Sequence, residues 1–254
     1  MLGGFVKSNS NIENWHGADM HVHTPASNDY KGNKDEKEYY RILLSANRKF
    51  KQTEAISDAE FDKSIRVIAI TDHNSVEGFR YLITKKDETL KLVELLESRN
   101  LQINEELKEE AAVYENICIL MGVEIKVYPG VHIQIIFRED VTCEEVITFL
   151  EKGLNNSYAE VKGNPDAALK WRVDEAFDEV ERVFGQKALI IAPHVDRTNG
   201  LLEVLKGSAQ AKMDALRHPV LKCLSFNNVE TREYLIKNIF NKPEYKRNVP
   251  VSYT

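Results

Sequence analysis

The sequence predicts an α/β fold in which a largely parallel sheet forms a small (β/α) barrel. Short apolar runs rich in β-branched residues recur along the 254-residue chain, and amphipathic stretches lie between them. Strands that alternate with helices favour parallel pairing, because each helix returns the chain to the same edge of the sheet. The number of runs suits a small barrel, although the same pattern is compatible with an open sheet.

Each predicted strand is a short apolar run bounded by polar or turn residues. In chain order the strands are Ala18–His23, Arg66–Ile70, Ile117–Glu124, Val131–Phe137, Ala188–Ala192, Leu221–Phe226 and Val249–Tyr253. Amphipathic helices are predicted at Leu90–Leu96, Glu144–Leu150, Ala167–Phe184 and Thr231–Phe240. Asn164 and Pro165 are residue types favoured at the N-cap and the first helical position, so they mark the start of the third helix. The link 127–130 is too short for a helix and predicts a hairpin.

The composition is that of an ordinary globular protein, with 43% hydrophobic and 29% charged residues. No apolar run approaches the roughly 20 residues that a membrane span requires, and the first residues do not resemble a secretion signal. The three cysteines have no paired spacing, which indicates reduced thiols. The net charge of −6 argues against a broad surface for nucleic acid. We therefore expect a cytoplasmic protein with no membrane partner.

A pair of histidines lies at the end of the first predicted strand. Because side chains alternate between the two faces of a strand, His21 and His23 project to the same side. Parallel α/β folds build their sites at the carboxyl ends of strands, so this pair is a natural first half of a metal site. The alternative is a pair of hydrogen-bonded imidazoles in an inert polar groove.

The second predicted strand runs directly into an acid and a histidine. His73 is a candidate metal ligand. Asp72 either binds the metal itself or orients an imidazole that does so. The alternative is a helix cap by Asn74 or Ser75, ahead of a helix that begins at Val76. That alternative accounts for Asn74 but leaves the acid and the histidine without a role.

Three more polar side chains follow or begin apolar strands. Glu124 ends the third strand, an unfavourable place for a carboxylate unless it is paired or holds a metal, and a structural salt bridge is the competing explanation. His132 begins the fourth strand, after the hairpin turn, and His194 follows the fifth. Arg197 is close to this position and could bind phosphate, although a surface arginine is the simpler interpretation.

Together these positions place six side chains at one edge of the predicted sheet: His21, His23, His73, Glu124, His132 and His194. Imidazole and carboxylate donors without thiolates suit zinc, manganese or iron, and their number is too high for one tetrahedral ion. Two or three divalent metal ions would activate water and stabilise a leaving oxygen, which matches the hydrolysis of a phosphoester. His16 and His218 lie away from the strand ends, so we expect neither to be functional.

These motifs resemble, in the same order, those of PHP (polymerase and histidinol phosphatase) domains: His21-Val-His23-Thr24-Pro25-Ala26-Ser27, Thr71-Asp72-His73-Asn74, Gly122-Val-Glu124 with His132, and Pro193-His194. The resemblance implies a distorted seven-stranded (β/α) barrel with a di- or trinuclear metal centre. It also implies metal-dependent phosphoesterase activity, either a phosphatase or a nuclease, on nucleic acid or nucleotides. The same six side chains would be metal ligands. Asp29 stands where many members place another ligand; otherwise it is a solvated loop acid.

The resemblance also bears on the boundaries of the domain. It predicts an N-terminal segment at 1–17 and a single PHP-like domain at 18–254. PHP domains end with an Asp-x-His motif after the last strand, but this sequence finishes at Val249-Pro-Val-Ser-Tyr-Thr254. We therefore expect a C-terminally truncated domain that lacks the last metal motif. The loop 24–37 is more narrowly similar to PHP domains that are linked to ATPases, which suggests an ATPase domain or partner.

Two alternatives to a phosphoesterase remain open at this point. An amidohydrolase also begins with His-x-His on a barrel strand, but it would require a lysine at a later strand end, where the predicted pattern has acids and histidines. A PHP module without catalytic activity could instead regulate an ATPase, and the missing last motif permits that interpretation.

Overall fold

One sheet of eight strands organises the part of the chain that the structure describes. The structure is a computed structural model, and it describes residues 17–51, 65–237 and 251–253. The strands are β1 (Gly17–Val22), β2 (Ile65–Ile70), β3 (Cys118–Tyr128), β4 (Val131–Phe137), β5 (Ala168–Arg172), β6 (Ala188–Ala192), β7 (Leu221–Phe226) and β8 (Val251–Tyr253). Their order across the sheet is β1-β2-β3-β4-β6-β7-β8, and β5 pairs with β3. The mixed α/β class is therefore confirmed.

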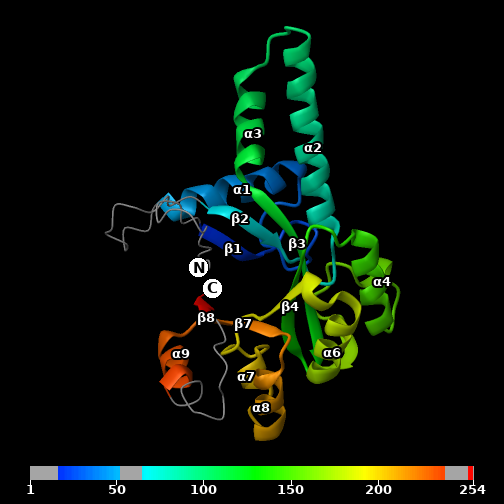
Figure 1. Ribbon diagram of the computed structural model, residues 1–254, viewed down its shortest axis with the longest axis vertical. Coiled ribbons are helices and arrows are strands. Elements are labelled where there is room, and N and C mark those ends of the chain that lie inside the picture. Colours follow the sequence, from blue (N-terminus) through cyan, green and yellow to red (C-terminus); the bar gives the residue numbers. More distant parts are fainter. Residues whose placement is uncertain (1–16, 52–64, 238–250, 254) are drawn as a thin grey trace.

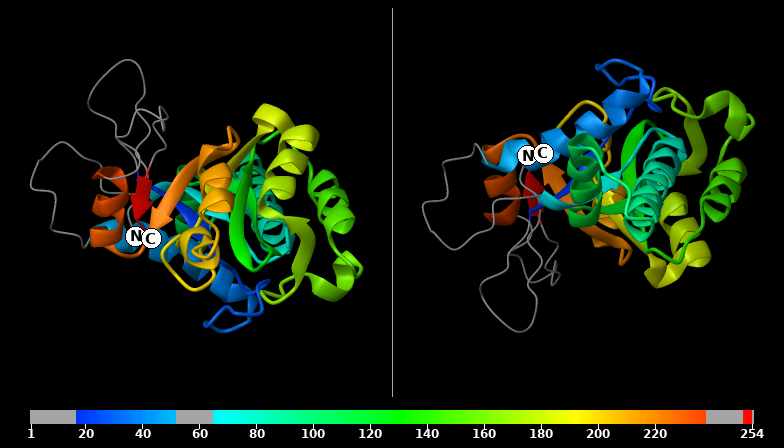
Figure 2. Two further views of the ribbon diagram at one scale, coloured as in Figure 1. Left: turned by 90° about the horizontal axis from the view of Figure 1, so that it is seen from below. Right: turned by 90° about the horizontal axis from the view of Figure 1, so that it is seen from above.

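The sheet curls into an open half-barrel (Figures 1 and 2). Neighbouring strands pair parallel from β1 to β3 and from β6 to β8, as predicted. The hairpin of β3 and β4 is antiparallel, as the short link 127–130 predicts, and β4 also runs antiparallel to β6. Within the described residues no ladder joins β8 to β1, so the barrel is partial.

Helices cover the convex side of this curled sheet. In chain order the helices are α1 (Glu36–Lys51), α2 (Glu77–Ser98), α3 (Glu105–Asn116), α4 (Cys143–Gly153), α5 (Tyr158–Val161), α6 (Val173–Phe184), the short 3₁₀ helix Gly185–Lys187, α7 (Leu201–Val204), α8 (Ala209–Arg217) and α9 (Val229–Leu235). The largest apolar core joins α4, α6, α7 and α8 to one face of β3 and β4. A second core packs α1, α2 and α3 against β1 and β2. In the described part of the chain, no helix is long and apolar enough to cross a membrane.

Alternation along β3 separates the core from the opposite face. Ile125 and Val127 are fully buried in the large core, whereas Glu124 and Lys126 point to the other side of the strand. The concave side of the sheet is therefore free to carry polar groups. This division lets one strand contribute to both the core and the site.

One predicted helix begins later than expected. The prediction places a helix at Ala167–Phe184, but residues 168–172 form β5 and the helix starts at Val173. The reason is tertiary: β5 pairs with β3, with Lys126 opposite Ala168. The predicted capping residue Asn164 instead accepts a hydrogen bond from the backbone N–H of Asp166, which closes a turn. The sheet consequently has one strand more than the seven that the sequence predicts.

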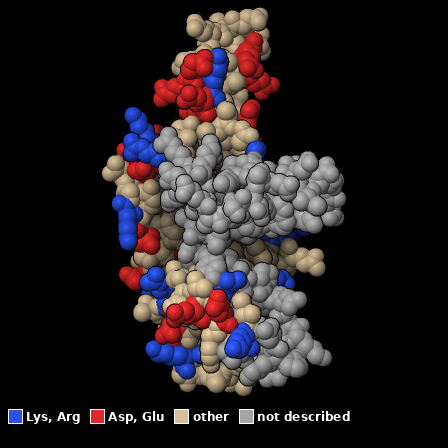
Figure 3. Space-filling view, turned by 90° about the vertical axis from the view of Figure 1, so that its left-hand side faces the viewer, with Lys and Arg blue, Asp and Glu red and all other residues tan. Residues whose placement is uncertain are grey.

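The hairpin of α2 and α3 projects from the body of the molecule (Figure 1). Exposed acidic residues of α3 include Glu105, Glu106 and Glu109. Figure 3 shows acidic and basic side chains intermixed along this hairpin and on the body below it, as far as that face is described.

Helix α2 packs closely on the loop that follows β1. Gly78, in the first turn of α2, lies against the carboxylate of Asp72 and the hydroxyl of Thr24. The hydroxyl donates to Asp72 Oδ2 at 2.7 Å, and both residues are completely buried. A Cβ at position 78 would overlap this pair, and neither partner is a flexible side-chain end that could move aside.

We predict that Gly78→Ala destabilises the protein, although alanine is intrinsically the better helix former. Overpacking a fixed site costs about 1–3 kcal/mol, which outweighs the gain in propensity. The free energy of unfolding is measured by urea denaturation with circular dichroism, in the presence of a chelator. Gly207→Ala is the matched control, because a Cβ there meets open space. Equal stability of the two variants would contradict the close contact.

Candidate metal centre

A cavity of about 380 Å³ lies where the carboxyl ends of the parallel strands meet. All the side chains predicted as metal ligands line it: His21, His23, Asp29, His73, Glu124, His132 and His194. Lys126, Pro165, Asp166, Thr198 and Asn199 complete the lining. The structure therefore brings the predicted set together, from strands and loops that are far apart in the sequence.

Strand direction explains why these residues meet. His21 is the penultimate residue of β1, and His73 and His194 come shortly after β2 and β6 end. Strand β4 runs antiparallel to β3, so the start of β4 lies at the same edge as the ends of the parallel strands. His132 is consequently placed beside Glu124.

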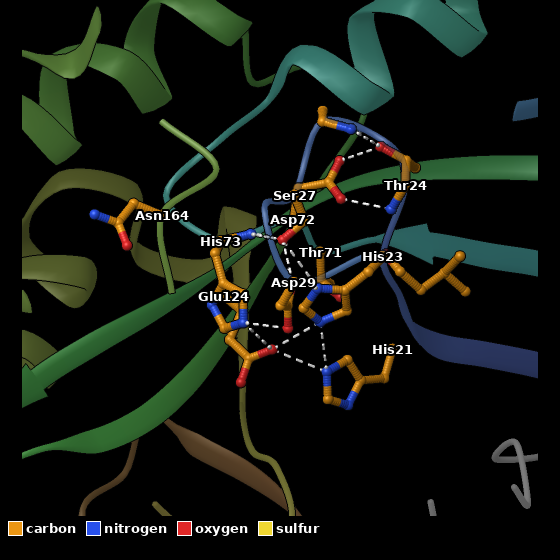
Figure 4. A network of polar contacts seen from close by, with 12 residues as sticks. His21, His23, Thr24, Ser27, Asp29, Thr71, Asp72, His73, Glu124 and Asn164 are labelled. Atoms are coloured by element: carbon orange, nitrogen blue, oxygen red, sulfur yellow. Dashed lines mark hydrogen bonds and ion pairs between the residues drawn. The ribbon is translucent and has the colours of Figure 1, made fainter. Parts of the chain in front are cut away.

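Glu124 is at the centre of the cluster and is 1% exposed (Figure 4). Its Oε2 lies 2.9 Å from His21 Nε2 and 3.0 Å from His23 Nε2. Its Oε1 lies 2.7 Å from His132 Nδ1 and 3.8 Å from His194 Nε2. The two oxygens of one carboxylate thus contact imidazoles on two sides. This arrangement suits a carboxylate that is shared between two metal positions.

Asp29 and Ser27 extend the cluster toward the loop after β1. Asp29 Oδ2 lies 3.3 Å from His73 Nε2, and Asp29 Oδ1 lies 3.4 Å from His23 Nδ1. The hydroxyl of Ser27 donates to Asp29 Oδ1 at 2.7 Å and also accepts from the backbone N–H of His73. Asp29 is about half exposed, so it is solvated and also in contact with His23 and His73.

Ligand atoms gather in three overlapping groups within which all lie less than 4.8 Å apart: His21 with His23 and Glu124, His23 with Asp29 and His73, and His73 with Glu124 and His132. Each group shares one residue with each of the others. Shared ligands are the arrangement expected where two or more ions lie a few ångströms apart.

The arrangement of buried nitrogens fits metal binding. In the described residues, His73 Nδ1 and His194 Nε2 are buried and have no hydrogen-bond partner. Buried polar atoms are normally paired, so the unpaired His194 Nε2, 3.8 Å from Glu124 Oε1, is a feature that a cation explains. Burial lowers the pKa of His194 to about 4 and also lowers the pKa of His73. Both rings are therefore neutral at pH 7, the form that binds a metal.

Charge is distributed differently around His23. Burial opposes its charged form, but its contacts with Asp29 and Glu124 raise the pKa of His23 to about 10. Burial alone would raise the pKa of Glu124, yet the contacts with His132 and His21 hold it well below its usual range. The contact with His23 likewise holds the pKa of Asp29 well below its usual range. Without metal, a proton on His23 compensates the carboxylates.

Asp72 stabilises the loop after β1, which carries part of the cluster. Its two oxygens accept from the backbone N–H and the hydroxyl of Thr24, at 2.6 and 2.7 Å (Figure 4). Burial raises the pKa of Asp72 to about 6, against the opposing effect of these two bonds. The acid therefore fixes the backbone directly after His23. Its hydrogen bonds go to Thr24 in this loop, whereas the sequence predicts a metal or an imidazole as its partner.

Asn74 joins the loops on either side of the cavity. It has a positive φ of 49°, which asparagine tolerates better than most residues. Its side-chain amide donates to the carbonyl oxygens of Asn164 and Ala167, at 3.0 and 2.9 Å. Asn74 therefore does not cap α2, whose N-cap is Val76, whereas the hydroxyl of Ser75, the other predicted cap, accepts a hydrogen bond from the backbone N–H of Glu77 at the start of the helix.

Four polar residues of the lining were not predicted from the sequence: Lys126, Asp166, Thr198 and Asn199. Lys126 is two residues beyond Glu124 on the same strand, so alternation alone places it on the same face. Asn199 lies in the loop after β6, and its amide nitrogen is 3.3 Å from His132 Nδ1, a contact for which the sequence gives no signal. Arg197, predicted as a substrate contact, is exposed and is not among the described residues that line the cavity. His218 pairs with Asp178 outside the cavity.

Comparison with known proteins gives structural neighbours alone. No family model matches the chain, and no curated protein matches it in sequence. Among solved structures, the chain is similar to endonuclease Q in complex with a 27-mer duplex substrate with an abasic lesion at the active site. The TM-score is 0.45 at 15% identity, and the match covers 82% of this chain and 41% of that one. The lesion-specific endonuclease PfuEndoQ from Pyrococcus furiosus matches with a TM-score of 0.44 at 14% identity and the same coverage. The chain spans about 41% of the length of these neighbours.

We predict that metal binding releases protons at pH 7.5. The raised pKa of His23, about 10, means that its ring is protonated without metal and must lose that proton to ligate. Calorimetric titration with Zn²⁺ in Pipes, Hepes and Tris, which differ in heat of ionisation, should give heats that depend on the buffer. Asp29→Asn removes one of the groups that raise the pKa of His23, so it should release fewer protons. Binding heats that are identical in all three buffers would contradict the charge distribution.

Proposed function

We propose that this protein is a metal-dependent phosphoesterase of the PHP type, with two or three divalent ions held by the cavity. The observation that carries the proposal is the buried Glu124 carboxylate with imidazoles at both of its oxygens. The donors are imidazole and carboxylate without thiolate, a set that suits zinc, manganese or iron. The ligands would be His21, His23, Asp29, His73, Glu124, His132 and His194.

Bound metal ions of this kind supply a hydroxide nucleophile near neutral pH and stabilise negative charge on phosphoryl oxygens. The residues of the chain supply the charges that attract the ions and the contacts that hold the surrounding loops. Glu124 and Asp29 bring two negative charges to a ring of imidazoles, which favours divalent cations over single protons. Asp72 and Thr24 hold the loop that carries His23, and Asn74 ties the loop that carries His73 to residues 164–167. The cavity volume is within the range of small-ligand sites, so it accepts the phosphoryl group of a larger substrate.

The proposed substrate class is a phosphate ester of a nucleotide or nucleic acid. The regulatory alternative, a module without catalytic activity that acts on an ATPase, is favoured by no specific feature of the described cavity. It would be recognised by metal binding without hydrolysis.

Hydrolysis is tested on protein reloaded with Mn²⁺ or Zn²⁺ after chelation. The panel contains p-nitrophenyl phosphate, bis(p-nitrophenyl) phosphate, single- and double-stranded oligonucleotides, and an amide substrate for the amidohydrolase alternative. We expect hydrolysis of a phosphoester and none of the amide. His21→Ala should lower kcat/KM by at least about 100-fold, because it removes a ligand that contacts Glu124. His218→Ala, a histidine outside the cavity, should retain activity.

Circular dichroism and thermal unfolding must show that both variants remain folded. Equal activity of His21→Ala and wild type would contradict the assignment of the cavity as the active site. Absence of phosphoester hydrolysis in the metal-loaded wild type would contradict the proposed function.

A further inference from the structure

Lys126 is the one lysine or arginine among the described residues that line the cavity. It lies two residues beyond Glu124 on the same face of β3, about 7 Å further along the strand. In the ladder it stands opposite His132. Its side chain therefore lies next to the proposed ligands in the wall of the cavity.

The ammonium group of Lys126 is weakly paired. Among the described residues, its polar contact is with Asp166 Oδ1, at 3.6 Å, which is longer than a hydrogen bond. The side chain of Lys126 is 27% exposed, whereas that of Asp166 is 91% exposed. An ion pair of this length with such an exposed carboxylate contributes little to stability. The lysine is thus held mostly inside the wall of the cavity without a strong partner.

A phosphoryl oxygen is the partner that this position fits. Lysine binds phosphate as a point charge, and it needs no fixed bidentate geometry. The neighbouring carboxylates Glu124 and Asp29 are already in contact with imidazoles. A ligand with negatively charged oxygens inside the cavity would meet Lys126 on the open side. The loosely placed Asp166 could move into solvent when this ligand binds.

On the basis of the proposed function, we propose that Lys126 binds a non-bridging oxygen of the substrate's phosphoryl group, and that Asp166 is displaced from the lysine when the substrate binds. Lys126 is then a substrate-binding residue of the active site, and Asp166 competes with the substrate for it. The shared chemistry is a phosphoryl oxyanion, which a monoester or a diester can supply.

The test measures the binding of inorganic phosphate to metal-loaded protein by titration calorimetry, with dimethyl phosphate as the diester probe. Lys126→Met keeps most of the apolar stem and removes the charge. Loss of a charge-assisted hydrogen bond should weaken phosphate binding about 10- to 100-fold. Lys126→Arg restores the charge and should bind within about threefold of wild type, since both side chains donate to phosphate. Asp166→Asn should bind phosphate up to about fivefold more tightly, because it removes the competitor.

Metal content and thermal unfolding are measured for every variant, so that loss of fold or of ligands is separated from loss of the phosphate contact. Lys108→Met is the matched control, because this lysine pairs with Glu105 on α3, away from the cavity. Unchanged phosphate affinity in Lys126→Met, with full metal content, would overturn this inference but would not contradict the proposed phosphoesterase function. If the metal-loaded wild type binds neither probe and hydrolyses no phosphoester, both this inference and the proposed function are overturned. Preference for phosphate over dimethyl phosphate, lost in Lys126→Met, would support a monoester contact through this lysine, and the reverse preference would support a diester.

Discussion

The carboxylate of Glu124 is the group on which the whole cavity depends. It is buried at the centre of β3, where an isolated charge would be strongly unfavourable. It is tolerated because its two oxygens contact imidazoles from β1, from the loop after it and from β4. The concave face of the sheet carries this polar cluster, and the convex face carries the largest apolar core.

The surrounding loops are held by polar contacts whose partners are distant in the sequence. Asp72 fixes Thr24, and Asn74 reaches the carbonyl oxygens of Asn164 and Ala167. Gly78 lets α2 approach this network without overlap. These contacts hold the loops that carry His23 and His73, so these two imidazoles need little reorganisation when a cation binds. Preorganisation of this kind is what a metal site requires of its supporting residues.

The sequence predicts much of this arrangement, since its strongest signals are local. Apolar runs next to His21 and His73 mark the strand ends, and alternation assigns the faces of the strands. The sequence predicts that Glu124 ends its strand, but β3 continues to Tyr128 and the carboxylate lies within it. The features that the sequence does not predict depend on how elements far apart in the chain pair in space. Strand β5 has a pattern that continues into α6, and its pairing with β3 decides its conformation. The partner of Asp72 lies 48 residues away, and the pairing of Lys126 with Asp166 requires β3 and the loop before β5 to be side by side.

The count of metal ions per chain tests the central role of Glu124 most directly. Wild type and Glu124→Gln are loaded with Zn²⁺ or Mn²⁺, dialysed extensively and analysed by inductively coupled plasma mass spectrometry, with circular dichroism to verify the fold. The account predicts at least two equivalents in the wild type and loss of most of them in Glu124→Gln, because this carboxylate contacts both sides of the cluster. A wild type that holds no metal, or a folded Glu124→Gln that keeps the full complement, would contradict it.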